Sequence, residues 1–255
     1  MEKRQKDFKY HFMKYLILLL FCLPVAQVSA QTTFISSGRI EFERKTNQHL
    51  DLNDDSEWIV EMKKRIPKFV TDVFELVFIG EISVYKLARE TPDNKYTWGG
   101  KPSSSDLVVQ NYGKRQLSIQ RDVFEQTYLL QDSLRHFEWR ITDEKREIAG
   151  FDCRKAVTRI CDSVYVVAFY TDQIPVSSGP ESFGNLPGMI LGLAVPRLSI
   201  TWFATRVELI TPTAQLLQPA LKGKKTNWVK YNADLQKAMK DWGKEGTSNI
   251  WKFSL

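Results

Sequence analysis

The sequence predicts a mostly β fold of the α+β class, a large curved antiparallel sheet with one early and one C-terminal helix. Apolar and polar residues alternate in many consecutive segments, and a period of two is typical of strands with one buried face. Short polar turns separate these segments, and short connections join neighbouring antiparallel strands. Two further segments space their apolar residues as helices do, so helices are available to cover one face of the sheet.

Residues 1–30 have the composition of a secretory signal peptide. A basic stretch comes first, the apolar run "YLILLLFCLPVAQ" begins at Tyr15, and Val28 and Ala30 place small residues before a cleavage site. The apolar run is shorter than the ~20 residues that a membrane-spanning helix needs. We therefore expect cleavage near Ala30 and an exported mature chain, periplasmic or extracellular, that does not span the membrane.

The mature chain is expected to be residues 31–255, a length that suits a single domain. Cys22 follows the bulky Phe21, whereas lipid attachment requires a small residue at that place, so a lipoprotein is not expected. The segment from Met13 would form a compact signal by itself, and a start at Met1 or at Met13 stays open.

The net charge of +6 for the whole chain overstates the charge of the mature protein. Residues 1–30 contain five of the 36 Lys and Arg and two of the 30 Asp and Glu, so the mature chain carries about +3. Its clearest basic cluster, "KGKK" at 222–225, is typical of a solvated linker. A nucleic-acid partner is therefore not expected.

The first part of the mature chain predicts a strand, a helix and a hairpin. "SGRIEFER" from Ser37 alternates as a half-buried strand does. Ser56 is a suitable N-cap for a helix that Pro67 ends. The apolar face of that helix would consist of Trp58, Ile59, Met62 and Ile66. Two strand patterns then meet around Gly80, and residues 91–106 are rich in Pro, Gly and Ser, as in an exposed loop.

Strand patterns resume after this loop and predict an antiparallel meander. The expected strands are 107–112, 115–122, 125–132, 135–142, 147–160, 163–171, 188–196 and 198–209. A C-terminal helix is expected at about 226–243, with Thr226 or Asn227 near its cap and Gly243 at its end. Its apolar face would consist of Trp228, Tyr231, Leu235 and Met239.

The mature chain contains two cysteines, Cys153 and Cys161, and export would place them where disulfides can form. The strand-like alternation between them would separate their Cα atoms by ~26 Å, whereas a disulfide spans ~4.4–6.8 Å. Free thiols are therefore expected, and a bond only if the chain turns near residues 157–159. Cys153 is better explained as a small core residue than as a nucleophile.

The sequence contains no pattern that predicts catalysis, a metal site or a cofactor, and we do not expect an enzyme. His49 and His136 are the histidines of the mature chain, and neither has metal-ligand spacing with a cysteine. His136 is expected on the solvent side of a strand rather than in a Ser-His-acid arrangement. The motifs G-x-S-x-G and H-E-x-x-H and the phosphate-binding glycine loop do not occur.

Between Trp139 and Leu193 the sequence resembles the GLPGLI family of exported Bacteroidota proteins. The family pattern runs W-x-I, I-x-G-[YF]-x-C-x-K-A, an aromatic-Tyr-Thr near D-x-I-P, G-P and G-L-P-G-L-I-L. The family-motif residues are Trp139, Gly150, Cys153, Lys155, Tyr170, Pro175, Gly179, Pro180, Asn185, Leu186, Pro187, Gly188, Met189 and Ile190. Asn185 and Met189 depart from the pattern, but Asn tolerates the left-handed conformation of the Gly that it replaces, and Met is a conservative packing change.

The resemblance implies export and a β-rich fold, and the activity of the family is not established. By analogy of fold, the pattern is similar to the curved half-barrel sheets of periplasmic lipoprotein carriers. Family members are also associated with outer-membrane receptors for nutrient uptake. The resemblance thus suggests partners but does not define a biochemical activity.

The stretch "GPESFGNLPGMILGL" from Gly179 lies between two expected strands, so we interpret it mainly as a structural connection. Its residues with unusual or fixed backbone angles would be Gly179, Gly184, Gly188 and Pro187. Met189, Ile190 and Leu191 would then enter the core, and Gly192 would mark a bend or a close approach.

Two functions fit these observations. In the first, the protein is a non-catalytic binding or carrier module whose curved sheet encloses an apolar ligand or lipid. The pocket would be lined by apolar groups such as Phe74, Phe78, Trp139, Tyr170 and Trp202. In the alternative, the protein is an interaction module that docks onto an outer-membrane nutrient receptor or surface protein through an exposed Gly/Pro loop. A filled and closed core would weigh against the carrier.

Overall fold

One open β-sheet dominates the structure, a computed structural model that describes residues 34–50, 52, 56–89, 91–92, 94–95, 101–160 and 163–255. These residues belong to one compact unit, Phe34–Leu255. The expected signal peptide and Cys161 lie outside the described residues, so the expectations about them stay predictions.

Twelve strands form the sheet in this described part of the chain. They are β1 (Ser37–Asn47), β2 (Phe69–Ile79), β3 (Ile82–Arg89), β4 (Leu107–Asn111), β5 (Gln116–Val123), β6 (Gln126–Ser133), β7 (Arg140–Ile148), β8 (Phe151–Ile160), β9 (Val164–Thr171), β10 (Met189–Val195), β11 (Ile200–Glu208) and β12 (Lys224–Thr226). Their order is β12-β6-β5-β4-β3-β2-β1-β11-β10-β9-β8-β7. Neighbours are antiparallel, as predicted, except that β12 pairs with β6 in parallel. The basic cluster at 222–225 is therefore a linker only in part, because its second half joins the sheet edge.

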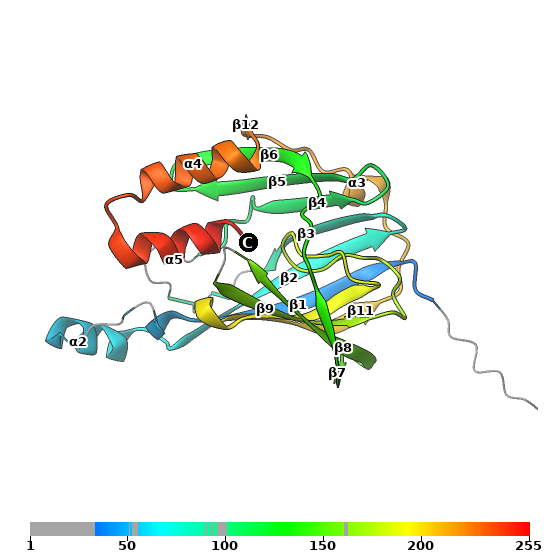
Figure 1. The fold of residues 1–255 in the computed structure, drawn as a ribbon, viewed down its shortest axis with the longest axis horizontal. Helices are drawn as coiled ribbons and strands as arrows, with labels where there is room; N and C mark the ends of the chain where they lie inside the picture. The colour runs from blue at the N-terminus through cyan, green and yellow to red at the C-terminus, as the bar shows by residue number, and fades with distance from the viewer. Residues whose placement is uncertain are drawn as a thin grey trace, which may run out of the picture. The chain divides into compact units, whose positions relative to one another are not determined.

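The strand order requires the sheet to curve. β1 to β6 form one meander and β7 to β11 a second, and β1 pairs with β11 where the two meet. β6 and β7 are thus ten strand spacings apart, which is about 48 Å in a flat sheet. Residues 134–139 alone connect them, and this link can span at most about 25 Å. The predicted curved sheet is therefore confirmed, and Figure 1 shows the strands changing direction from β5 to β7.

Two strand predictions in this region need correction. Residues 135–139 are not part of a strand, and β7 begins only at Arg140, because the preceding residues cross between the two edges of the sheet. The expected strand 147–160 is divided by a turn at Ala149 and Gly150, whose φ angles are +52° and +82°. Glycine adopts this left-handed conformation readily, which places the turn between β7 and β8.

The early helix is confirmed as α2 (Glu57–Arg65), which follows Ser56 and ends before Pro67. Of its expected apolar face only Ile59 is buried, and Trp58 is 65% exposed. The other short helices are η1 (Gln48–Leu50), η2 (Pro196–Leu198) and α3 (Ala214–Leu217). In the described part of the chain, every helix is too short or too polar to span a membrane.

The C-terminal helix is confirmed as α4 (Trp228–Ala238), with Asn227 as its cap: the Asn227 side chain accepts a hydrogen bond from the backbone N–H of Lys230 at 3.0 Å. Gly243 does not end this helix. It begins a further helix, α5 (Gly243–Phe253), which was not predicted. The α5 sequence "GKEGTSNIWKF" has low helix propensity, so packing of its apolar residues against the core must stabilise it.

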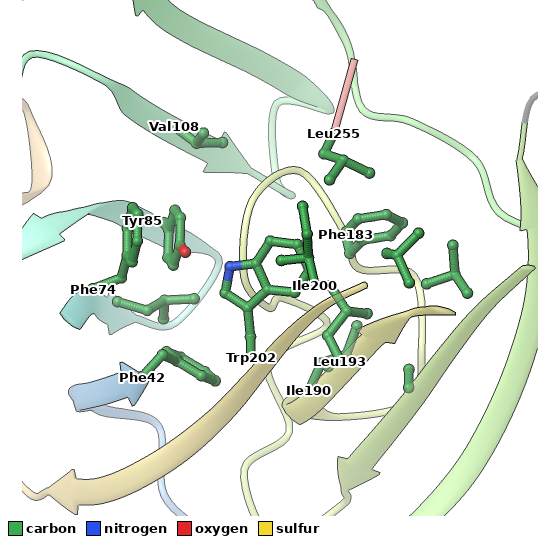
Figure 2. Close-up of a cluster of buried hydrophobic side chains, with 14 of the residues drawn as sticks. Phe42, Phe74, Tyr85, Val108, Phe183, Ile190, Leu193, Ile200, Trp202 and Leu255 are labelled. Carbon is green, nitrogen blue, oxygen red and sulfur yellow. The ribbon is translucent and has the colours of Figure 1, made fainter. Parts of the chain in front are cut away.

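The concave side of the sheet holds the main hydrophobic core (Figure 2). Phe42, Phe74 and Trp202 enter it from β1, β2 and β11, and each is at most 3% exposed. Phe183 and Leu255 join them from outside the sheet. Figure 1 shows α4 beside β6 and α5 within the curve of the sheet, so both helices help to close this side.

Candidate functional site

The connection between β9 and β10, residues 172–188, lies inside the curve of the sheet, and we call it the interior loop. Its buried residues are Ile174, Val176, Ser178, Gly179, Pro180, Glu181, Ser182, Phe183, Gly184, Leu186 and Gly188. The Phe183 ring stacks on that of Phe137 with centroids 5.0 Å apart. The alternative docking function requires this Gly/Pro loop to be exposed, but most of the loop is buried, because its apolar side chains fill the concave side.

Backbone conformation and tight space shape the interior loop. Asn185 has a φ of +67° and Gly188 a φ of +152°, as predicted for these two positions. Gly179 and Gly184 do not adopt positive φ, so that part of the prediction is wrong. Gly184 is needed for space instead, because a Cβ there would overlap the hydroxyl of Tyr112.

The strand that follows enters the core as predicted. Met189, Ile190 and Leu191 are fully buried in β10. A register shift between Ile190 and Gly192 marks a bulge, and a Cβ on Gly192 would lie 2.8 Å from Cδ1 of Ile148. Gly192 therefore marks both a bend and a close approach.

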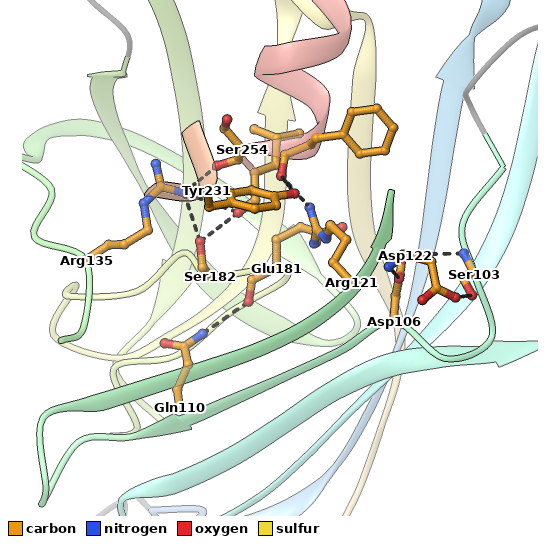
Figure 3. Close-up of polar contacts among 12 residues, drawn as sticks. Ser103, Asp106, Gln110, Arg121, Asp122, Arg135, Glu181, Ser182, Tyr231 and Ser254 are labelled. Atoms are coloured by element: carbon orange, nitrogen blue, oxygen red, sulfur yellow. Dashed lines mark hydrogen bonds and ion pairs between the residues drawn. The ribbon is translucent and has the colours of Figure 1, made fainter. Parts of the chain in front are cut away.

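Polar side chains attach the interior loop to its surroundings (Figure 3). Gln110 of β4 donates a hydrogen bond from Nε2 to the carbonyl oxygen of Glu181 at 3.2 Å. Trp139 donates from Nε1 to the carbonyl oxygen of Gly184 at 2.9 Å. The loop is thus held by the sheet on one side and by the segment that enters β7 on the other.

A buried ion pair joins the interior loop to β5. Nη2 of Arg121 lies 2.7 Å from Oε2 of Glu181, and the two side chains are only 11% and 6% exposed. Nη1 of Arg121 also donates to the carbonyl oxygen of Phe253 at 3.2 Å, at the end of α5. Burial alone would lower the pKa of Arg121, but the carboxylates of Glu181 and Asp106 raise it above its ordinary value. The guanidinium therefore stays charged inside the protein.

Arg135 fixes the end of the chain against the same loop (Figure 3). Its Nη1 donates to Oγ of Ser182 at 3.0 Å and to the backbone oxygens of Ser254 and Leu255 at 2.8 and 3.2 Å. Ser182 donates from Oγ to the backbone oxygen of Leu255 at 2.6 Å. Because carbonyl groups at a helix C-terminus carry partial negative charge, an arginine there stabilises α5.

Most family-motif residues meet at the interior loop. Those in it, bonded to it or flanking it are Trp139, Tyr170, Pro175, Gly179, Pro180, Asn185, Leu186, Pro187, Gly188, Met189 and Ile190. The other three lie apart on the β7–β8 hairpin. Gly150 is in its turn, Cys153 is buried, and Lys155 pairs with Glu144 at 2.6 Å.

The residues predicted to line an apolar pocket belong to the packed core. Phe74, Phe78, Tyr170 and Trp202 are each at most 3% exposed and pack in one cluster with Phe183 of the interior loop. Trp139 is half-buried and packs at the edge of this cluster. These side chains therefore pack against other side chains of the protein, whereas the carrier hypothesis requires them to contact a ligand.

Cys153 is a free thiol and fully buried, as predicted for a core residue. Burial raises the pKa of its thiol to about 12, so the reactive thiolate is scarce at neutral pH. We expect iodoacetamide to leave Cys153 unmodified in the native protein and to label it fully in urea. Peptide mass mapping measures this separately from Cys161, and equal labelling of Cys153 in both states would contradict a closed core.

The histidines do not meet in a catalytic or metal-binding arrangement. His136 is exposed, as expected, but it lies in the crossing segment rather than in a strand. Nε2 of His49 lies 3.2 Å from the carbonyl oxygen of Ile66. Among the described residues, no cluster of three or more His, Cys, Asp or Glu side chains is placed to hold a metal ion.

An open groove of about 530 Å³ lies between α4, α5 and the segment 134–139, and we call it the helical groove. It is lined by Arg135, His136, Trp228, Asn232, Gln236, Ile250, Trp251 and Ser254. Trp228, Asn232 and Gln236 are spaced four apart and so share one face of α4. The volume lies within the range of small-molecule sites, which makes this groove the candidate ligand site.

Several of these residues could be found in the sequence only in part. Arg121 occupies an inward position of the alternating series Leu117, Ile119, Arg121 and Val123, and a charged residue in such a series is a signal of a buried partner. The interior loop has no regular alternation of apolar and polar residues, so no local pattern predicts that Glu181 is buried or that it pairs with Arg121. The helical groove also depends on α5, which was not predicted.

Residues 158–192 match a family model described as "Protein of unknown function (Porph_ging)". The match covers the end of β8, β9, the whole interior loop and the start of β10. It falls within the stretch that resembles the GLPGLI family, although the family model carries a different name. No curated protein matches the chain.

The fold is similar to part of a larger solved protein, PNGF-II. The structure of PNGF-II in the P21 space group has a TM-score of 0.52 and 15% identity over 78% of this chain and 32% of its own. The structure of PNGF-II in the C2 space group has a TM-score of 0.52 and 16% identity over 85% of this chain and 33% of its own. An uncharacterized conserved protein from Thermus thermophilus has a TM-score of 0.37 and 4% identity over 74% of this chain and 90% of its own. The chain spans about a third of the length of PNGF-II, and the likeness to PNGF-II is one of fold alone.

Proposed function

We propose that the protein is a non-catalytic binding module of the cell envelope and that the helical groove is its ligand site. The observation that carries this proposal is the lining of the groove, which combines two indole rings with hydrogen-bonding groups. Trp228 and Trp251 supply the rings, and Asn232, Gln236 and Ser254 supply polar atoms. Sites for small molecules use apolar surface for affinity and a few polar groups for orientation.

The interior of the sheet is the weaker candidate for the ligand site. A lipid between Phe74 and Trp202 would have to displace the interior loop and separate Arg121 from Glu181. Leaving either charge buried without its partner is strongly unfavourable. A carrier function is therefore better supported at the helical groove than at the predicted apolar pocket.

Neither Cys153 nor Ser254 is in the environment of an activated nucleophile, which agrees with a non-catalytic role. Cys153 is buried as a protonated thiol, which is a poor nucleophile. Ser254 lines the helical groove, but its Oγ donates to Oδ1 of Asn232 at 3.2 Å rather than to a base. The activation that a serine nucleophile requires thus has no support at this groove.

The place of action in this proposal is the envelope of a bacterium. The family match at 158–192 lies within the resemblance to the exported GLPGLI proteins. The signal-peptide pattern of residues 1–30 supports the same location. In this proposal the mature chain binds its ligand in the periplasm or at the cell surface.

Native mass spectrometry of the chain purified from its source bacterium tests the function. We expect a small-molecule adduct on the wild type that is lost in Gln236→Trp, because the new indole would fill the helical groove. Lys237→Trp is the matched control, since Lys237 is an exposed neighbour on α4 outside the lining, and it should keep the adduct. Survival of the adduct in Gln236→Trp, or no adduct on the wild type, would contradict the proposal.

A docking function has one observation in its favour. Phe124 is 53% exposed at a φ of +55°, and its ring packs against that of Trp242, which is 42% exposed, with centroids 5.5 Å apart. A bulky residue in the left-handed region is unusual and invites a functional explanation. If the protein docks onto a receptor, Phe124→Ser should abolish co-purification of an outer-membrane protein while Gln236→Trp leaves it intact.

A further inference from the structure

We propose that the helical groove selects a ligand that carries a carboxylate beside a ring; this rests on the proposed function and names the chemistry of the ligand. Arg135 is the charged side chain of the lining, and no acidic side chain lines the groove among the described residues. A carboxylate would therefore enter a positive environment, whereas a cation would be repelled.

A second guanidinium flanks the groove. Arg197 of η2 lies over the ring of Trp251, 4.6 Å from its centroid, and Arg197 itself is exposed. Arg135 lies in the same way over Trp228, 4.7 Å from the centroid. Each indole of the groove is thus paired with an arginine, and the arginines approach the groove from two different elements.

This pairing of rings with guanidinium groups is suited to a cyclic acid. The exposed guanidinium of Arg197 can offer two parallel N–H groups to a carboxylate, which adds direction as well as affinity. Nη1 of Arg135 already donates to the interior loop and to the residues after α5, so Arg135 contributes its charge. An indole beside it offers a broad apolar surface on which the face of a ring packs. The neutral groups Asn232 and Gln236 can then bond to hydroxyl or carbonyl groups of the ligand.

Acidic residues close to the groove have other roles. Asp132 accepts a hydrogen bond from the backbone N–H of Trp228 at 3.0 Å, which fixes the start of α4. Asp234 pairs with Lys224 at 3.4 Å. Neither belongs to the lining, so the basic character of the groove is retained.

Matched pairs of probes test the inference on the full mature chain. D-glucuronate is compared with D-glucose, and benzoate with benzyl alcohol, by NMR titration of the tryptophan indole signals. We expect the acid of at least one pair to bind about tenfold more tightly than its neutral partner, as one charge-assisted hydrogen bond allows. The pair that responds tells a sugar acid from an aromatic acid.

Two charge variants make the test specific. Arg197→Gln should weaken binding of the acid several-fold and leave the neutral partner unchanged. Arg159→Gln removes the same charge from an exposed position on β8 and should change neither. Equal affinity for acid and neutral partner, equal effects of the two variants, or no binding of any probe would overturn the inference. The adduct measured by mass spectrometry decides separately whether the groove binds a ligand at all.

Discussion

Replacing Gly188 with valine is expected to prevent stable folding. Gly188 has a φ of +152°, a backbone angle that residues other than glycine rarely adopt. A Cβ at this position would also overlap the carbonyl oxygen of Thr171. The same Cβ would lie 2.7 Å from the carbonyl carbon of Thr171, and backbone atoms of a paired strand cannot move aside cheaply. We expect a loss of more than about 4 kcal/mol in the free energy of unfolding, a large part of the roughly 5–15 kcal/mol of a typical domain. Thermal and urea denaturation followed by circular dichroism measure it.

Gly80→Ala is the matched control for the backbone conformation. Gly80 has a φ of +52°, but a Cβ there would meet no atom within 4 Å. Its substitution should therefore cost only the conformational strain, about 1 kcal/mol. A Gly188→Val variant with unchanged melting and lost ligand binding would show that the interior loop serves contact with a ligand rather than structure.

The fold could be predicted because each strand carries its own evidence. The alternation in "SGRIEFER" from Ser37 and the strands that follow Leu107 reflects one buried face, and that pattern is local. Residues 135–139 of the crossing segment are predicted to be part of a strand because they alternate as well. The segment is a connection because it has to cross the distance between β6 and β7, and that distance is set by the curvature of the whole sheet.

The candidate site was harder to predict because it depends on contacts between distant parts of the chain. The interior loop is rich in Gly and Pro, which is typical of exposed loops, yet it is buried because a strongly curved sheet leaves a concave side to fill. α5 has poor helix propensity and is stabilised by tertiary contacts, including the hydrogen bonds of Arg121 and Arg135 to its last carbonyl groups. Neither effect is encoded in a local pattern.

Replacing Glu181 with glutamine is expected to destabilise the protein by about 3–5 kcal/mol. The substitution keeps the size of the side chain but removes the charge that faces Arg121 at 2.7 Å. Arg121 would remain charged and buried, and its contact with the carbonyl oxygen of Phe253, which holds the end of α5, would weaken. Urea denaturation measures the loss, and increased amide hydrogen exchange in α5 would locate it.

A double-mutant cycle with Arg121→Met separates the ion pair from the rest of the site. Each single variant removes one member of the pair and leaves the other charge buried, whereas the double variant Arg121→Met/Glu181→Gln removes both, so it should be more stable than the sum of the single losses predicts. The control is Arg89→Met, which breaks the pair with Glu41 at 3.0 Å, where the Arg89 side chain is 62% exposed. Solvent already screens that pair, so the control should lose at most about 1 kcal/mol. Equal losses at the two pairs would mean that water reaches Glu181 and that the interior loop opens in solution, which would restore the interior of the sheet as a place for a ligand.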